Sequence, residues 1–316
     1  MTGFPEVVHV HCITVHPSQR NIVFAGTHQG VYRSTDHGAS WRRMAMDPFD
    51  QQIWSITISP HDHKIMFAGA SPTDVFLSRD GGESWTRARR GHIADRLEMG
   101  AFKNRVMRIV VNPQDPLKLC AALEVNGTMS SEDGGETWVD RNEDLLRLSN
   151  EPNLRSQILT KDDAEGMLDA HAICMMPTDA GAIFLANRMG IFSSSDHGRT
   201  WRNLDVALQS EFTYGRDVRP SLCEPGVLYA CLSVHSQGPT GSLARSPDGG
   251  KTWVRFDHGV TPGSTCMAVA VHPDIAEAVY FVARKGEVFG TIDAGQNWRA
   301  YQLPPGCEGA YCIAMG

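Results

Sequence analysis

Several features that mark specialised classes of protein are absent from this chain. No two of the eight cysteines form a CxxC pair, which excludes a zinc knuckle or a dithiol redox motif. No apolar run is long enough to span a bilayer, and the first residues have neither the basic nor the apolar part of a secretion signal. Acidic residues number 36 against 29 Lys and Arg, a net charge of −7, so no positive excess attracts nucleic acid. We therefore expect a cytoplasmic protein that binds neither membrane nor nucleic acid.

The cysteines themselves indicate reduced thiols. Cys12, Cys174, Cys231, Cys266 and Cys312 stand among apolar neighbours in predicted strands. Free cysteine is commonly buried, and cytoplasmic thiols stay reduced. With 41% hydrophobic residues, the chain has enough apolar surface for a large core.

One short motif occurs six times. It reads Ser or Thr, any residue, Asp, any residue, Gly, any residue, a short polar residue and Trp, and its copies span residues 34–41, 78–85, 131–138, 194–201, 246–253 and 291–298. The Asp carboxylate can accept backbone N–H groups, and the Gly permits the positive φ of a tight turn. The motif predicts six hairpins in a repeat protein, with each Trp at the start of the following strand.

This motif resembles the Asp box of the BNR-repeat β-propellers. That family includes sialidases, some other glycosidases, sortilin-type receptors and photosystem II assembly factors. The resemblance extends from about Val8 to Trp298, and only the last copy departs from the pattern, with Asn297 before its Trp. It implies an all-β propeller without identifying an activity, because one fold carries many functions. By this resemblance the Asp-box acids are scaffold rather than catalytic groups.

The spacing of the motif fits four-stranded blades. The motif tryptophans recur at intervals between 44 residues, from Trp41 to Trp85, and 63 residues, from Trp138 to Trp201. We predict one domain over residues 1–316, an all-β six-bladed β-propeller of four-stranded blades with Asp-box hairpins. Residues 309–315 read as one more strand, which either helps to close the six-bladed ring or begins a seventh position.

A proline marks the turn after the innermost strand of each blade. Aligning these strands by Pro17, Pro60, Pro113, Pro177, Pro225 and Pro273 brings one row of residues to an equivalent position: His11, Trp54, Met107, His171, Arg219, Met267 and, by likeness of its strand, Tyr311. The residues two positions further along form an aliphatic row: Ile13, Ile56, Ile109, Ile173, Val269 and Ile313. We expect the first row to leave the core and line a pocket.

Alternating strand direction places the Asp boxes on one face and the entries to the innermost strands on the other. In the propellers that this chain resembles, the second face holds the ligand site at the mouth of the channel. Side chains that bind and transfer protons gather there in this sequence. We predict substrate contacts from Arg105, Arg188, Arg216, Trp54, Tyr214, Tyr311 and Asn126. We predict acid–base catalysis by His11, His171, Glu124 and Asp169. An alternative is a Zn²⁺ or Fe site formed by His9, His11, His28 and His171, and no other cofactor is indicated.

Two insertions, at residues 89–103 and 141–168, enter innermost strands on the same face. Asn142 can cap a short helix that has Glu143 and Asp144 in its first turn, so we predict a short helical insertion around 142–168. These insertions serve either as a lid or rim of the site, or, for 141–168, as an oligomer contact.

Two functions remain open at this point. The first is a propeller enzyme, a hydrolase or lyase, acting on a small anionic molecule at the face opposite the Asp boxes. The second is a non-catalytic interaction or assembly propeller. A classical sialidase is not expected, because the Arg-Ile/Leu-Pro motif that precedes the first Asp box in sialidases is absent here.

Overall fold

The structure is a computed structural model that describes residues 2–48, 51–97, 100–179, 181–304, 307 and 309–316. It divides into two compact units, which are described separately. The first unit comprises residues 1–170, 197–199 and 316, and the second comprises residues 171–196 and 200–315. Six sheets form among the described residues, five of four strands and one of five. The predicted six-bladed β-propeller of antiparallel blades is confirmed.

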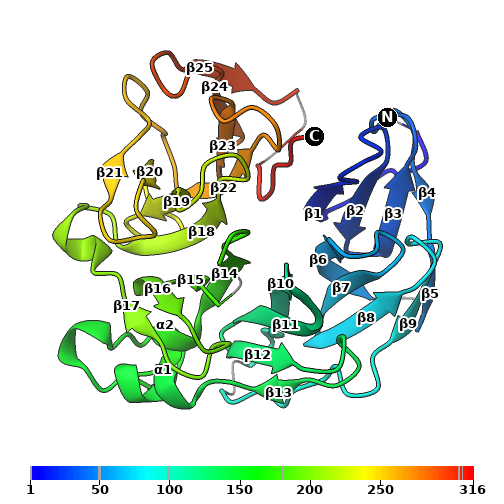
Figure 1. The fold of residues 1–316 in the computed structure, drawn as a ribbon, viewed down its shortest axis with the longest axis horizontal. Coiled ribbons are helices and arrows are strands. Elements are labelled where there is room, and N and C mark those ends of the chain that lie inside the picture. Colours follow the sequence, from blue (N-terminus) through cyan, green and yellow to red (C-terminus); the bar gives the residue numbers. More distant parts are fainter. Residues whose placement is uncertain (1, 49–50, 98–99, 180, 305–306, 308) are drawn as a thin grey trace. The chain divides into compact units, whose positions relative to one another are not determined.

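The first unit holds three blades, drawn from blue to green in Figure 1. Blade one is β1 (Val10–Val15), β2 (Val23–Thr27), β3 (Gly30–Ser34) and β4 (Arg42–Arg43). Blade two is β6 (Gln52–Ile58), β7 (Met66–Ser71), β8 (Asp74–Ser78) and β9 (Ser84–Arg87), and β5 (Ala45–Asp47) adds a parallel fifth strand beside β9. Blade three is β10 (Arg105–Asn112), β11 (Asp115–Glu124), β12 (Gly127–Ser131) and β13 (Val139–Asp140).

The second unit holds the other three blades. Blade four is β14 (Ala170–Met175), β15 (Ile183–Asn187), β16 (Gly190–Ser194) and β17 (Arg202–Asn203), followed by the short helix η2 (Val206–Leu208). Blade five is β18 (Tyr214–Pro220), β19 (Leu228–Ser233), β20 (Gly241–Ser246) and β21 (Val254–Arg255). Blade six is β22 (Cys266–Val271), β23 (Val279–Ala283), β24 (Glu287–Thr291) and β25 (Arg299–Gln302).

Hydrophobic cores lie between successive blades within each unit. Phe24 of β2 packs with Ile53 of β6 and Trp85 of β9, and similar clusters join blades two and three, four and five, and five and six. Hydrogen bonds cross the same interfaces, as where the Thr57 hydroxyl donates to the Ile109 carbonyl at 2.6 Å. Each sheet therefore buries the face that packs against its neighbour within the unit.

The Asp boxes act as turn scaffolds, as predicted. In the first box Asp36 Oδ1 accepts the backbone N–H of Ser40 at 2.8 Å, and Asp36 Oδ2 accepts the Ser40 hydroxyl at 2.6 Å. The Ser40 hydrogen bonds lower the pKa of Asp36 to about 2. In the last box the Asn297 amide replaces the hydroxyl and donates to Asp293 Oδ2 at 2.8 Å, so the one sequence departure preserves the turn.

A β-bulge recurs at one position in the first strand of the blades. The register shifts between Val10 and Cys12, Ile53 and Ser55, Val106 and Arg108, Gly215 and Asp217, and Cys266 and Ala268. The residues inside these bulges are His11, Trp54, Met107, Arg216 and Met267. A bulge inserts an extra residue and redirects its side chain, which gives the predicted row a backbone cause.

The bulge register corrects the sequence alignment in blade five. Arg216, not Arg219, occupies the equivalent position, because Pro225 lies three residues later in its turn than the other marker prolines. The Ser221 N–H donates to the Val227 carbonyl, just as the His16 N–H donates to the Ile22 carbonyl in blade one. Leu222, which follows Ser221, therefore occupies the position that Pro17 has after His16. Two residues beyond Arg216 comes Val218, which is fully buried and completes the aliphatic row.

The predicted C-terminal strand is wrong. Residues 309–316 form no strand in the structure, so Tyr311 has no strand register and leaves the row. Instead Ala310 donates its N–H to Arg284 O at 3.2 Å, and Ala310 and Ile313 pack on Met267. No seventh sheet forms within the described parts of the chain.

The 141–168 insertion is helical as predicted, with α1 (Glu143–Leu148), the 3-10 turn η1 (Pro152–Leu154) and α2 (Glu165–Leu168). Leu145 and Leu148 are buried and dock α1. Asn142 stands at the N-cap but its side chain does not cap the helix. Its Oδ1 accepts Thr128 N–H at 2.7 Å and its Nδ2 donates to the carbonyl of Asn126, so it fastens the insertion to blade three.

Candidate functional site

Three predicted site residues stack on one another in the first unit. The His11 ring, from β1, lies parallel to the Trp54 ring of β6, with centroids 3.8 Å apart and planes 8° apart. The guanidinium of Arg105, at the start of β10, lies 4.0 Å from the Trp54 centroid. Both His11 and Trp54 are bulge residues, so the backbone irregularity brings side chains of neighbouring blades together.

His11 is held in one tautomer. Its Nδ1 lies 3.1 Å from the carbonyl of Ile53, and because a carbonyl only accepts, Nδ1 carries the proton and Nε2 is an acceptor. Burial lowers the pKa of His11 to about 4, against the opposing effect of the Ile53 hydrogen bond, and the charges of Arg105, His28 and His9 lower it further. At neutral pH this imidazole is uncharged.

Arg105 connects the stack to Glu124, which lies near a second predicted catalytic acid, Asp169. Its Nη1 lies 2.8 Å from Glu124 Oε2 at the end of β11. The carboxylates of Glu124 and Asp169 lie within 4.8 Å of each other. Asp169, which follows α2, is buried. Two carboxylates and one guanidinium thus form a single cluster, in which Arg105 neutralises the charge of Glu124.

Two residues beside Arg105, Phe102 and Asn104, were not among the predicted site residues. The ring of Phe102, from the 89–103 insertion, has its centroid 4.7 Å from the Arg105 guanidinium. This is an aromatic contact, in addition to the ion pair with Glu124. Asn104 is buried, and its Nδ2, like the indole Nε1 of Trp54, finds no hydrogen-bond acceptor among the described residues. An aromatic and an amide directly before a strand-entry arginine were the signal available in the sequence.

The histidines proposed as metal ligands are only partly brought together. The His9 backbone N–H donates to His28 Nδ1 at 3.1 Å, and the two rings meet edge to face at 5.2 Å. Within the described residues of the first unit taken alone, no three His, Cys or carboxylate side chains converge closely enough to hold a metal. His171 belongs to the second unit, so the four-histidine site stays a prediction.

Asn126 is engaged in supporting structure. Its Oδ1 accepts the backbone N–H of Arg96 at 3.1 Å, and its Nδ2 donates to Ala94 O at 3.3 Å. The side chain therefore holds the 89–103 insertion against blade three, and the substrate contact predicted for it is not among these bonds.

A second group of a histidine, an aromatic ring and an arginine lies within the second unit. His171 of β14 lies 2.7 Å from the Gly215 carbonyl through Nδ1, and the Tyr214 hydroxyl lies 3.2 Å from His171 Nε2. The first contact places the proton on Nδ1, so the tyrosine donates to Nε2. The guanidinium of Arg188 lies 5.5 Å from the Tyr214 ring centroid. His171 and Tyr214 are both buried.

The remaining predicted contacts of the second unit lie in different settings. Arg216 is the bulge residue of β18 and is half-buried. Tyr311, 47% exposed, lies with its ring 5.9 Å from the Arg284 guanidinium. The Tyr311 ring therefore lies near Arg284 and does not occupy the bulge row.

Comparison with known proteins agrees with this architecture. The family model described as "Sortilin, neurotensin receptor 3" matches residues 29–167, a segment that contains three of the six Asp boxes. The chain therefore shares its Asp-box hairpins and its β-propeller fold with BNR-type propellers. A curated relative, a probable oligoxyloglucan-reducing end-specific xyloglucanase from Neosartorya fischeri, is 23% identical over 239 residues. That match covers 70% of this propeller but only 27% of the relative.

Solved structures show the same fold. The GH74 xyloglucanase from Xanthomonas campestris superposes with a TM-score of 0.71 at 17% identity, covering 94% of this chain and 45% of that enzyme. YCF48 from Cyanidioschyzon merolae superposes with a TM-score of 0.63 at 13% identity, covering 98% of this chain and 88% of that protein. The propeller therefore spans about half of the xyloglucanase and most of YCF48. No described helix is both long and apolar enough to cross a membrane.

Proposed function

We propose that this propeller is a hydrolase whose acid–base groups are Glu124 and Asp169. The observation that carries the proposal is their separation, within 4.8 Å, beside Arg105 at the start of β10. Two carboxyl groups this close match a retaining glycosidase. One protonates the leaving-group oxygen while the other attacks the sugar carbon and forms a glycosyl–enzyme bond, and the first then acts as base for the water that breaks this bond. The Asp-box acids do not compete for this role, because turn hydrogen bonds occupy both oxygens of Asp36 and of its equivalents.

The charge of this cluster favours an uncharged substrate. Arg105 is already paired with Glu124 at 2.8 Å, so its guanidinium is not available to hold an anionic substrate. This changes the emphasis of the sequence prediction, in which Arg105 held a small anionic molecule. An anionic substrate would instead need Arg188 or Arg216 of the second unit. The name of the xyloglucanase relative agrees with a glycosidic bond as the target.

His11 serves as support in this proposal. Trp54 and Arg105 stand between its ring and Glu124, so His11 does not reach the carboxylates directly. Its stacking fixes Trp54, and Trp54 in turn fixes the guanidinium that orients Glu124. The buried donors of Trp54 and Asn104 are suited to an acceptor oxygen of a substrate or an ordered water.

An activity screen tests the proposal. Wild type is assayed against neutral chromogenic glycosides and xyloglucan oligosaccharides, and in parallel against glucuronides and sialosides as anionic substrates. We expect hydrolysis of a neutral substrate, and a loss of at least about a hundredfold in kcat for Glu124→Gln and for Asp169→Asn. Asp133→Asn, in an Asp box, is the matched carboxylate control and should retain its turnover per folded molecule. Activity that survives both site variants removes these acids from the mechanism.

A second function is favoured by one observation, the share of each chain that the structural match to YCF48 covers. The structural match to YCF48 spans nearly the whole of both chains, and one such structure is titled YCF48 bound to D1 peptide. A non-catalytic propeller that binds a protein segment is the corresponding proposal here. Leu159, in the 141–168 insertion, is 71% exposed and suits such a contact.

Pull-down or self-association measurements on Leu159→Asp test this second function. The matched control is Leu208→Asp, since Leu208 is 84% exposed but lies on η2, outside the insertion. Loss of a partner or of self-association in Leu159→Asp alone supports the interaction role. Equal behaviour of the two variants contradicts it.

A further inference from the structure

A small cavity lies in the first unit, beside blade two. Its volume is about 290 Å³, and its lining comes from Pro48, Gln51, Pro72, Thr73, Asp74, Arg87 and His92. Pro48 follows β5 and Gln51 precedes β6. Pro72 and Thr73 form the β7–β8 turn, Asp74 begins β8, Arg87 ends β9, and His92 belongs to the 89–103 insertion. Small-molecule pockets begin at about 300 Å³, so the space suits a small ligand of one ring.

The charged groups of this cavity balance each other. Asp74 Oδ2 lies 2.5 Å from Arg87 Nε, and Asp74 Oδ1 accepts the backbone N–H of Val75 at 2.9 Å. Burial raises the pKa of Asp74, while the Val75 and Arg87 contacts hold it down. An anion placed on Arg87 would face the Asp74 carboxylate, and a cation placed on Asp74 would face the guanidinium. The pair therefore selects against a charged ligand.

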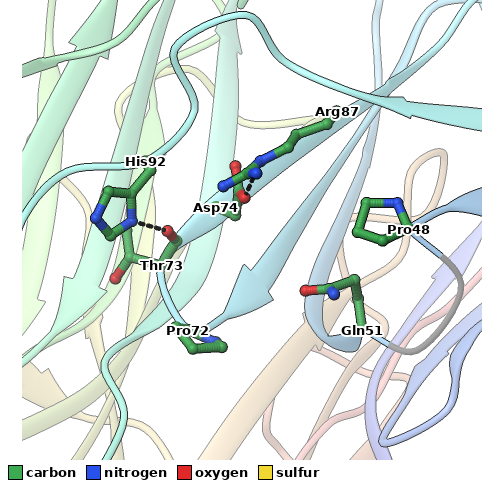
Figure 2. A pocket seen from close by; sticks show the side chains of 7 residues that line it. All are labelled: Pro48, Gln51, Pro72, Thr73, Asp74, Arg87 and His92. Carbon is green, nitrogen blue, oxygen red and sulfur yellow. Dashed lines mark hydrogen bonds and ion pairs between the residues drawn. The ribbon is translucent and has the colours of Figure 1, made fainter.

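The insertion is fitted closely to this pair. A Cβ atom added to Gly91 would lie 2.7 Å from Asp74 Oδ1 and from Val75 N, so only glycine lets the chain pass there. The next residue, His92, contacts the Thr73 carbonyl through Nδ1 at 2.9 Å. These contacts, of which the His92 hydrogen bond and the Asp74–Arg87 pair are drawn in Figure 2, give the cavity one fixed wall.

The hydrogen-bonding groups offer donors and acceptors side by side. In Figure 2 the Gln51 carboxamide faces the space that the lining residues surround, with the Pro48 ring next to it and Pro72 on the opposite side. A carboxamide presents one donor and one acceptor in a plane, and the ion pair likewise presents N–H groups next to carboxylate oxygens. The pyrrolidine rings supply apolar surface. A planar amide has the matching pattern, an N–H beside a C=O on a flat, weakly polar body.

We propose that this cavity binds a small uncharged amide or lactam, with Gln51 pairing to its N–H and C=O edge and the Asp74–Arg87 pair bonding a second edge. The site is separate from the Glu124–Asp169 cluster and does not depend on hydrolysis. It supplies the propeller with a recognition site for a heterocyclic amide or an amide-bearing side chain.

Ligand-observed saturation-transfer NMR tests this site with uracil as the probe. We expect uracil to bind, and 1,3-dimethyluracil, whose N–H groups are blocked, not to bind. Gln51→Leu keeps the size of the side chain but removes its carboxamide, and should weaken uracil binding about tenfold. Gln296→Leu, at an exposed glutamine in the last Asp box, is the matched control and should bind uracil like wild type.

The proposal is overturned if uracil does not bind, if the methylated probe binds equally well, or if Gln51→Leu binds uracil like wild type. Preferential binding of glycerol would also overturn it and would mark the cavity as a polyol site. Asp74→Asn gives a second readout, because it preserves shape but breaks the charge balance. It should admit acetate, which wild type excludes, only if the neutral pair sets the selectivity.

Discussion

Each unit of this propeller joins a histidine, an aromatic ring and an arginine near the start of a first strand. The two groups differ in the geometry of their rings and in their hydrogen-bond and ion-pair partners. In the first unit His11 lies flat on Trp54, Arg105 lies 4.0 Å from the same ring, and the arginine continues to Glu124. In the second unit Tyr214 is tilted by 48° to His171 and its hydroxyl meets Nε2, while Arg188 lies 5.5 Å from the tyrosine ring.

The difference shows that the partner of the ring decides what the histidine can do. An indole offers His11 a face but no acceptor or donor at Nε2, so that nitrogen is kept as an acceptor. A phenol offers His171 a hydroxyl, so both of its nitrogens are bonded. Substitutions that remove one partner at a time separate these arrangements.

The largest expected effect comes from Arg105→Ala. The change leaves Glu124 without its cation beside the Asp169 carboxylate, and we expect a loss of about 2–4 kcal/mol in the free energy of unfolding. Arg188→Ala is the counterpart in the second unit. It removes a longer cation–aromatic contact, and the loss of this contact should lower the free energy of unfolding by about 1 kcal/mol or less. Urea unfolding of both variants measures the difference. Equal losses would show that the Glu124 pair adds nothing beyond the aromatic contact.

The next effect is a pH dependence that belongs to His11. Its pKa falls from an ordinary value of 6.5 to about 4 on folding, so the unfolded chain binds the proton more readily between these values. The resulting stability is complete above pH 6.5 and is lost as the pH falls towards 4, by about 2 kcal/mol after allowance for solvent screening.

Thermal unfolding between pH 7 and pH 4 measures this effect against His11→Phe, which keeps a stacked ring but has no titratable group. The variant should lose less stability than wild type over that interval. Parallel curves for the two proteins would assign the acid sensitivity to other groups.

The smallest expected effect is that of Tyr214→Phe. It removes only the hydroxyl that meets His171 Nε2, and we expect a loss of about 1 kcal/mol. Trp54→Phe is the counterpart, since the Trp54 N–H has no described acceptor and only stacking area is lost. A hydrogen-exchange or NMR probe of the His171 tautomer should change in Tyr214→Phe. An unaltered tautomer with unaltered stability would show that this hydroxyl does not fix the imidazole.

Parts of the site followed from the sequence because the repeats carry them. Spacing from the marker prolines placed His11, Trp54 and His171 at one strand position, and the structure puts a bulge at the first two. Blade five has Leu222 in place of the marker proline, so the spacing from Pro225 predicts Arg219 where the structure has Arg216. Phe102 and Asn104 could not be predicted from the repeats, because they precede β10 in or beside an insertion that no other blade shares.

The six Asp boxes by themselves determined the fold, since Asp, Gly and Trp at fixed spacing specify a turn through bonds that stay within eight residues. The tertiary structure alone decided the partners of Arg105. Its stacking on Trp54 crosses from blade three to blade two, and its approach to Glu124 depends on the register of β10 against β11, with one bulge in the ladder. Local hydrogen bonds can be read from adjacent residues, whereas contacts between blades depend on how strands from distant parts of the chain are paired and packed.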